Sequence, residues 1–178
     1  GRTEPSNHSP TGWGGAFNTP FKMWERYGNP RGGTADPLLV SWPARIKAKG
    51  QFRTQYTHAI DIVPALYEAL GVELPDVVNG YTQKPMEGVS FTSSFDDPEA
   101  DTGKETQFFS MLGTRAIWHR GWKAATLSPA APNAWGGFSH HRWELFHTDA
   151  EPAEARHLAD DRPGRPPEPP ARGGVQRA

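Results

Sequence analysis

Glycine and proline limit the fold of this chain more than any other feature of its sequence. Among 178 residues there are 19 glycines and 18 prolines, more than a fifth of the chain. Both residue types interrupt helices and strands and favour turns. We therefore expect short regular elements joined by many turns. Aromatic residues make up 11% of the chain, which is too many for a wholly disordered protein, so part of it must pack.

One helix is clearly indicated between Asp61 and Gly71. Asp61 is a favourable cap, Pro64 is tolerated in the first turn, and a glycine at the position of Gly71 commonly ends a helix. Apolar residues recur between these ends at helical spacing and share one face, namely Ile62, Ala65, Leu66, Ala69 and Leu70. The pattern predicts an amphipathic helix with an apolar face for packing.

Short strands are indicated in the second half of the chain. The candidates are residues 107–111, 115–119, 122–127 and 142–146. Arg120 and Gly121 suit a tight hairpin between the second and third candidates. Four antiparallel strands with the predicted helix packed on one face make a small α+β unit.

Elsewhere the sequence predicts mainly loops. Residues 1–18 are rich in Gly, Ser and Pro, and residues 83–106 form a loop that carries an acidic run. Residues 21–27 can form one or two helical turns. Residues 37–42 are a candidate buried strand that ends at Pro43, because proline has no N–H to donate to a neighbouring strand.

Charge and composition exclude several kinds of partner. The formal net charge is -1, and no basic stripe interleaved with aromatic residues is present, so nucleic acid is not an expected partner. No apolar run approaches the roughly 18 residues of a membrane span, so no membrane partner is expected either. The chain has no cysteine, which excludes disulfides and thiolate metal sites and leaves the compartment undecided.

An ordered series of segments resembles the bacterial arylsulfatase branch of the sulfatase family. The segments are NTPFKMW at 18–24, RGGTADP at 31–37, VSWP at 40–43, THAIDIVP at 57–64, EGVSF at 87–91 and WELF at 143–146. In that family a loop with a catalytic lysine leads into a Gly-Gly turn, a buried strand and a Trp-Pro pair. A helix and a small C-terminal sheet follow. The resemblance covers roughly residues 8–160.

The resemblance implies an α/β fold of the alkaline-phosphatase type, of which this chain is the C-terminal part. Residues 1–80 are then the end of the catalytic domain, and residues 81–160 are a small antiparallel subdomain. Residues 161–178 are rich in Pro, Arg and Gly, and we expect them to be a disordered tail.

The family hydrolyses sulfate esters with a formylglycine, made from the Cys or Ser of a Cys/Ser-x-Pro-x-Arg motif, beside a bound calcium ion. The resemblance implies a small-molecule sulfate ester as substrate. We expect this chain to lack both the nucleophile and the calcium ligands, which would precede residue 1. By itself the chain is then expected to be inactive.

More than one residue of this chain can be aligned with the family's catalytic lysine. It lies six residues before the Gly-Gly pair, and that count from Gly32 reaches Arg26. Alignment on Trp24 places Glu25 there instead, and the nearest lysine is Lys22. Arg26 and Lys22 are therefore both catalytic candidates, and a third alternative is that no basic group reaches the site. A guanidinium can bind a sulfate oxygen but does not release a proton near neutral pH.

Four further residues are candidates for contact with the substrate. His8, Trp13 and Trp24 belong to the loop that resembles the family's substrate entrance, and His58 precedes the predicted helix. Each has a structural alternative. His8 can be a surface residue, His58 can bond the backbone at the helix start, and the tryptophans can fix the loop to the core.

Two other functions fit parts of the sequence. One is a non-catalytic carbohydrate-binding module that uses Trp13, Trp24 and Trp135. The other is a phosphohydrolase of the same superfamily, because phosphate and sulfate esters have similar geometry. The coding sequence ahead of residue 1 would separate these alternatives from a sulfatase.

Overall fold

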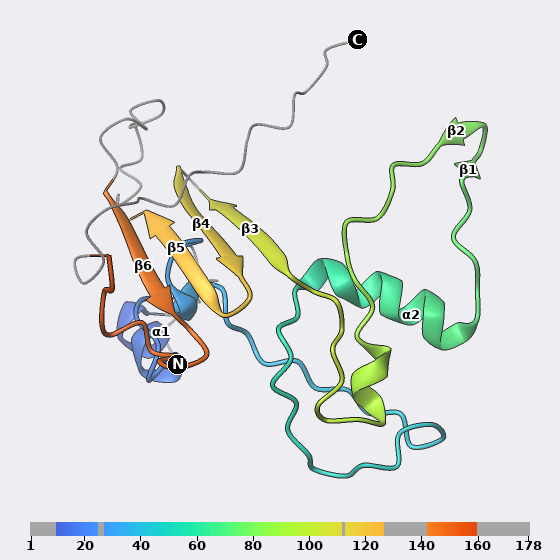
Figure 1. The fold of residues 1–178 in the computed structure, drawn as a ribbon, viewed down its shortest axis with the longest axis horizontal. Helices are drawn as coiled ribbons and strands as arrows, with labels where there is room; N and C mark the ends of the chain where they lie inside the picture. The colour runs from blue at the N-terminus through green and yellow to red at the C-terminus, as the bar shows by residue number, and fades with distance from the viewer. Residues whose placement is uncertain (1–9, 25–26, 112, 127–141, 160–178) are drawn as a thin grey trace, which may run out of the picture. The chain divides into compact units, whose positions relative to one another are not determined.

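The computed structural model describes residues 10–24, 27–111, 113–126 and 142–159 (Figure 1). The chain forms two compact units, one drawn from Gly1–Pro37 and Thr106–Ala178 and the other from Leu38–Glu105. The domain limits at residues 80 and 160 stay a prediction, and the expected tail lies outside the described residues. None of the helices in the described part of the chain has the length and apolar character needed to cross a membrane.

The first unit is built on a four-stranded antiparallel sheet. Its strands are β3 (Thr106–Met111), β4 (Thr114–His119), β5 (Trp122–Thr126) and β6 (Trp143–His147). They lie side by side in chain order, each paired with the next. Arg120 and Gly121 join β4 to β5 with φ values of 45° and 82°, as a two-residue hairpin turn requires. All four predicted strands and this hairpin are confirmed.

One face of the sheet holds a small core. Residues opposite each other on neighbouring strands share a face, so the register places Ala116 beside Ala125 and Lys123 beside Phe146. Ala116, Ala125 and Phe146 are buried there, with Phe109 packed against them. Because the two alanines are small, this face has room for a covering segment.

The segment before the sheet differs from its prediction. Thr11–Phe17 forms the helix α1, although residues 1–18 are predicted as loop, and residues 21–24 form a bend rather than a helical turn. Three glycines give α1 a poor helix propensity. Side-chain contacts compensate, since Trp13 stacks on Phe17 one turn away with a centroid distance of 5.5 Å.

The second unit contains the predicted helix. It comprises the 3-10 helix η2 (Ala59–Asp61), α2 (Ile62–Leu70), the two-stranded hairpin of β1 (Val77–Val78) and β2 (Tyr81–Thr82), and the 3-10 helix η3 (Thr92–Phe95). Gly71 ends α2 in the left-handed region, with φ 64°. Helix α2 is in contact with η2 and η3. Its packing on the four-stranded sheet stays a prediction.

One local prediction is wrong, and one hairpin of the second unit was not predicted. Residues 37–42 are irregular and not a strand, and Leu39 is 91% exposed. A strand needs a neighbour for its backbone groups, and no described strand pairs with this segment. The β1–β2 hairpin was not predicted, although Asn79 and Gly80 at its turn are a strong signal for one.

Candidate functional site

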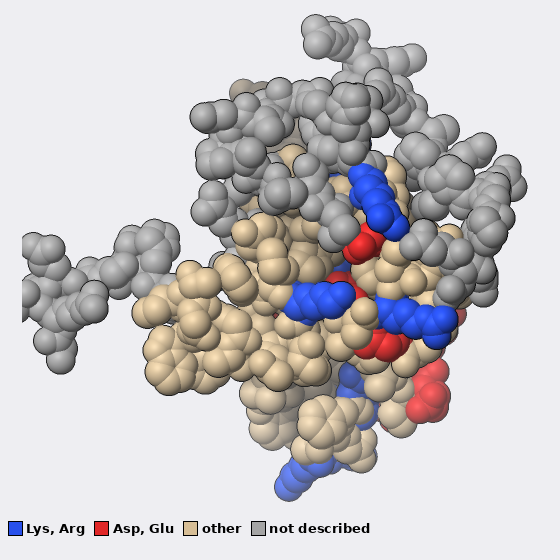
Figure 2. Space-filling model, turned by 90° about the vertical axis from the view of Figure 1, so that its left-hand side faces the viewer, with Lys and Arg blue, Asp and Glu red and all other residues tan. Residues whose placement is uncertain are grey.

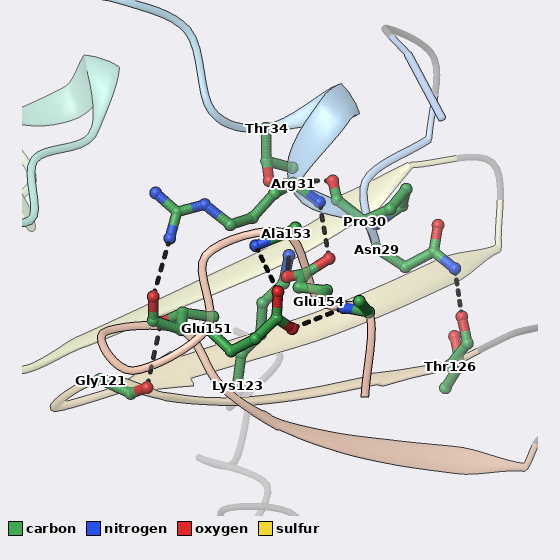
Figure 3. Close-up of polar contacts among 12 residues, drawn as sticks. Asn29, Pro30, Arg31, Thr34, Gly121, Lys123, Thr126, Glu151, Ala153 and Glu154 are labelled. Carbon is green, nitrogen blue, oxygen red and sulfur yellow. Dashed lines mark hydrogen bonds and ion pairs between the residues drawn. The ribbon is translucent and has the colours of Figure 1, made fainter. Parts of the chain in front are cut away.

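A loop of residues 27–34, the docked loop, lies against the sheet of the first unit. It includes the 3-10 helix η1 (Arg31–Gly33). The backbone N–H of Gly28 donates to Thr114 Oγ1 at 3.3 Å, and the buried side chain of Asn29 donates to the carbonyl oxygen of Thr126. These bonds join the start of the loop to β4 and β5, and Figure 3 shows the one between Asn29 and Thr126.

A buried ion pair lies beneath the docked loop. Lys123 Nζ on β5 is 2.8 Å from Glu154 Oε1, and the two side chains are only 3% and 2% exposed. The other carboxylate oxygen of Glu154 accepts the backbone N–H of Arg31 at 2.9 Å. We call Arg31, Lys123 and Glu154 the Glu154 cluster. One carboxylate therefore joins the sheet to the loop (Figure 3).

Burial and neighbouring charges act in opposite directions on the pKa of Lys123. Burial lowers the pKa of the Lys123 ammonium, the Glu154 carboxylate opposes this shift, and the nearby Arg31 guanidinium adds to it. Glu154 also has a positive φ of 55°, which is uncommon outside glycine. Its backbone is held there by the turn in which Glu151 accepts bonds from the N–H groups of Ala153 and Ala155.

The predicted residues of the first unit lie around this loop. Lys22 is exposed on the loop's N-terminal side, with Nζ 5.9 Å from the centre of the Phe146 ring. Trp24 is half-buried and contacts Tyr27 edge-on at 6.0 Å. Trp13 is 60% exposed. Arg26, His8 and Trp135 lie outside the described residues, so the choice between Arg26 and Lys22 stays open.

His58 belongs to the second unit and has a structural role there. It caps η2, because its Nδ1 accepts the N–H of Ile60 at 3.4 Å while its own N–H donates to Asp61 Oδ2 at 2.8 Å. This confirms the alternative in which the histidine bonds the backbone at a helix start. Asp61 is itself buried and paired with Lys104 at 2.9 Å. Burial and the Lys104 charge lower the pKa of His58, and Asp61 opposes the shift.

Charge on the described surface is mixed. In Figure 2 basic side chains lie close to acidic ones, and among the residues drawn in colour no continuous basic field covers this face. The described ranges contain no group of three or more His, Cys, Asp or Glu placed to hold a metal ion. The residues present therefore do not fit a calcium site, and we derive no chemical step through calcium.

One segment matches the formylglycine motif letter for letter, contrary to our expectation that this chain lacks it. Residues 41–45 are SWPAR. Ser41 is exposed and precedes a turn in which Trp42 O accepts the N–H groups of Arg45 and Ile46 at 3.0 and 2.8 Å. Arg45 is paired with Asp96 at the surface.

Comparison with known proteins supports a fold and not an activity. No family model matches the chain, and no curated protein matches it. A solved sulfatase structure from Bacteroides thetaiotaomicron is similar, with a TM-score of 0.54 and 22% identity. It is described as part of a versatile core genetic locus that orchestrates the metabolism of multiple glycosaminoglycans.

That likeness covers 77% of this chain but only 28% of the sulfatase. The fold of the chain is therefore an α+β arrangement that resembles the C-terminal part of a sulfatase.

The Glu154 cluster was missed in the sequence. In the sequence Lys123 stands out only as part of the candidate strand 122–127 and Arg31 only as part of the segment 31–37, and nothing connects either residue to Glu154. A weak signal was present, because Lys123 lies within the apolar run from Trp122 to Ala125. A lysine at such a position is buried only with a partner of opposite charge. The partner, Glu154, lies 31 residues away, and no local sequence pattern identifies it as the partner of Lys123.

Proposed function

We propose that this chain is part of a sulfate ester hydrolase and forms one wall of its substrate pocket. The fold carries the proposal, because it resembles a sulfatase over 77% of the chain. The docked loop adds support, since its buried ties hold the adjoining residues 21–24 on a rigid sheet. Precise positioning of substrate-binding groups is a main source of catalysis.

In this proposal the segment that precedes the docked loop supplies one basic group and aromatic surface. Lys22 or Arg26 binds a sulfate oxygen and offsets the negative charge that develops as the S–O bond breaks. Trp13 and Trp24 offer flat surfaces for an aryl leaving group. His8 lies in the same entrance segment. The capping bonds of His58 argue for a structural role instead.

The remaining chemistry is assigned to residues ahead of residue 1. When bound there, calcium would hold the sulfate oxygens, and a formylglycine would supply the nucleophile. The residues of this chain bind and orient the ester and exclude water from it. This division of labour rests on the family resemblance.

The 178-residue chain alone tests the division of labour. We expect no turnover of a nitrophenyl sulfate, with or without added calcium. If turnover is seen, the Ser41→Ala variant shows whether the SWPAR segment is its source. Loss of that turnover in Ser41→Ala would place the nucleophile in this chain and contradict the proposal.

A longer chain, expressed with the coding sequence ahead of residue 1, tests the activity itself. We expect it to hydrolyse nitrophenyl sulfate in preference to nitrophenyl phosphate. Either Lys22→Ala or Arg26→Ala should lower kcat/KM roughly a hundredfold, while the exposed Lys47 gives a control in Lys47→Ala. Preference for phosphate would favour the phosphohydrolase, and binding of sulfated carbohydrate without turnover would favour the binding module.

A further inference from the structure

We infer that Glu154, through the docked loop, is a positioning residue for the adjoining segment that carries the proposed sulfate-binding group. The inference rests on the proposed function for the identity of that segment. Its structural basis is a chain of direct contacts from the buried Lys123 on β5 to the backbone of Lys22. The chain of contacts has three links.

The first link orients Glu154 itself. Lys123 Nζ forms an ion pair with one oxygen of the Glu154 carboxylate at 2.8 Å and lies 5.9 Å from the centre of the Phe109 ring. Because both partners are almost fully buried, the carboxylate has little freedom to turn. Its second oxygen is thereby directed to the N–H of Arg31.

The second link fixes Arg31 at both ends. While its N–H is held by Glu154, its guanidinium donates to the carbonyl oxygen of Thr148 at 3.3 Å and lies over the Phe21 ring at 5.1 Å. Thr148 is in turn bonded to the carbonyl oxygen of Gly121 through its N–H and its hydroxyl, at 2.8 and 3.0 Å. Arg31 therefore joins the loop to the β4–β5 hairpin.

The third link passes from Arg31 to the proposed basic group. Gly32 follows directly, and its N–H donates to the carbonyl oxygen of Lys22 at 3.1 Å. A Cβ on Gly32 would clash with that oxygen, and one on Gly33 would clash with the carbonyl oxygen of Tyr27. The two glycines thus let the backbone at Lys22 and at Tyr27 lie directly on the turn held by Glu154.

A purely structural role would not require a carboxylate. Apolar residues of similar size often replace a buried ion pair without loss of stability. A carboxylate has two acceptor oxygens, and here one binds the sheet and the other a backbone N–H of the loop. Leucine cannot accept the Arg31 N–H, whereas glutamine can. This difference separates positioning from packing.

Two double variants make the test. Lys123→Met with Glu154→Leu removes both charges and the acceptor. Lys123→Met with Glu154→Gln removes both charges and keeps an acceptor. Hydrogen exchange of the Arg31 and Gly32 amides is measured by NMR in the 178-residue chain, relative to the amides of β5. We expect exchange at least about tenfold faster in the leucine variant than in the glutamine variant.

Equal exchange of these amides in the two variants would overturn the inference. If the leucine variant does not fold, the glutamine variant is compared with a third double variant, Lys123→Met with Glu154→Asn. Asparagine keeps the amide group, but its side chain is too short to accept the Arg31 N–H. Slow exchange of Arg31 in the asparagine variant would then count against the role of Glu154.

Activity of the longer chain provides a second measurement. The leucine variant should lose roughly tenfold or more in kcat for a sulfate ester, and the glutamine variant should retain most of it. If the unmodified longer chain does not turn over sulfate esters, the proposed function fails, while the exchange comparison still tests the positioning. If it does turn them over and both variants match it, the positioning role fails alone.

Discussion

Two ion pairs of this chain have the same chemistry and very different surroundings. Lys123 and Glu154 are 3% and 2% exposed, whereas Arg45 and Asp96 are 52% and 58% exposed. Both pairs have an N–O distance of 2.8 Å. Removing one partner of a buried pair leaves an uncompensated charge in the interior, but water solvates the remaining partner of an exposed pair.

Stability should follow burial and not distance. We expect Lys123→Met to lower the free energy of unfolding by about 3–5 kcal/mol. Arg45→Ala should lower it by less than about 1 kcal/mol. Urea denaturation of the two variants measures both values. Equal losses would show that the Lys123 pair is more accessible to water than the structure indicates.

His58 should make the second unit sensitive to mild acid. Its pKa is lowered from the ordinary 6.5 by burial and by Lys104. Between the folded pKa and 6.5 the unfolded chain therefore binds more protons, so stability falls as pH decreases through that window. His58→Asn keeps a capping acceptor but does not titrate.

The comparison is made by urea denaturation at several pH values between about 7.5 and 5.5. We expect a smaller loss of stability on acidification for His58→Asn than for the unmodified chain. An equal loss in both proteins would assign the acid sensitivity to other groups.

At the scale of elements, the sequence predicted those parts whose signals are local. The strands β3 to β6 and the helix α2 have periodic patterns and turn residues at their ends, and all are confirmed. Helix α1 was missed because its glycines argue against a helix, and the nearness of Trp24, whose ring would lie 3.5 Å from a Cβ added to Gly14, is not visible in a pattern. The predicted strand at 37–42 has the right residues but no described neighbour. The site was partly predicted, since the loop was located but Glu154 was not connected to it.

Helix α2 should tolerate change at Leu70 and not at Ala65, although the sequence pattern places both on one apolar face. Leu70 is 69% exposed, whereas Ala65 is 4% exposed. We expect Leu70→Gln to change the free energy of unfolding by no more than about 0.5 kcal/mol. Ala65→Leu should lower it by about 1–3 kcal/mol through overpacking. Thermal denaturation measures both, and a large loss for Leu70→Gln would contradict the observed exposure.

At the scale of the whole molecule, the second unit presents much apolar surface. Phe52 is 94% exposed and Leu39 is 91% exposed. Such surface is typical of regions that contact another protein segment. The chain spans 28% of the sulfatase that it resembles.

The isolated chain should therefore bind an apolar fluorescent dye and self-associate as its concentration increases. Leu39→Ser combined with Phe52→Ser should reduce both effects without unfolding the chain, as circular dichroism would verify. Analytical ultracentrifugation and dye fluorescence provide the measurements. A monomer that binds no dye would mean that this surface is covered in solution.

The interrupted first unit has a consequence for synthesis on the ribosome. Residues 38–105 are contiguous, and this segment can begin to fold while the remainder is still being translated. The N–H of Arg31, by contrast, must wait for an acceptor 123 positions later in the chain. Contacts between such distant residues form slowly, because a long loop has to close first. The nascent polypeptide thus leaves the Arg31 N–H without its Glu154 acceptor until the turn after β6 has emerged, and a chaperone has its best opportunity to bind the docked loop during that interval.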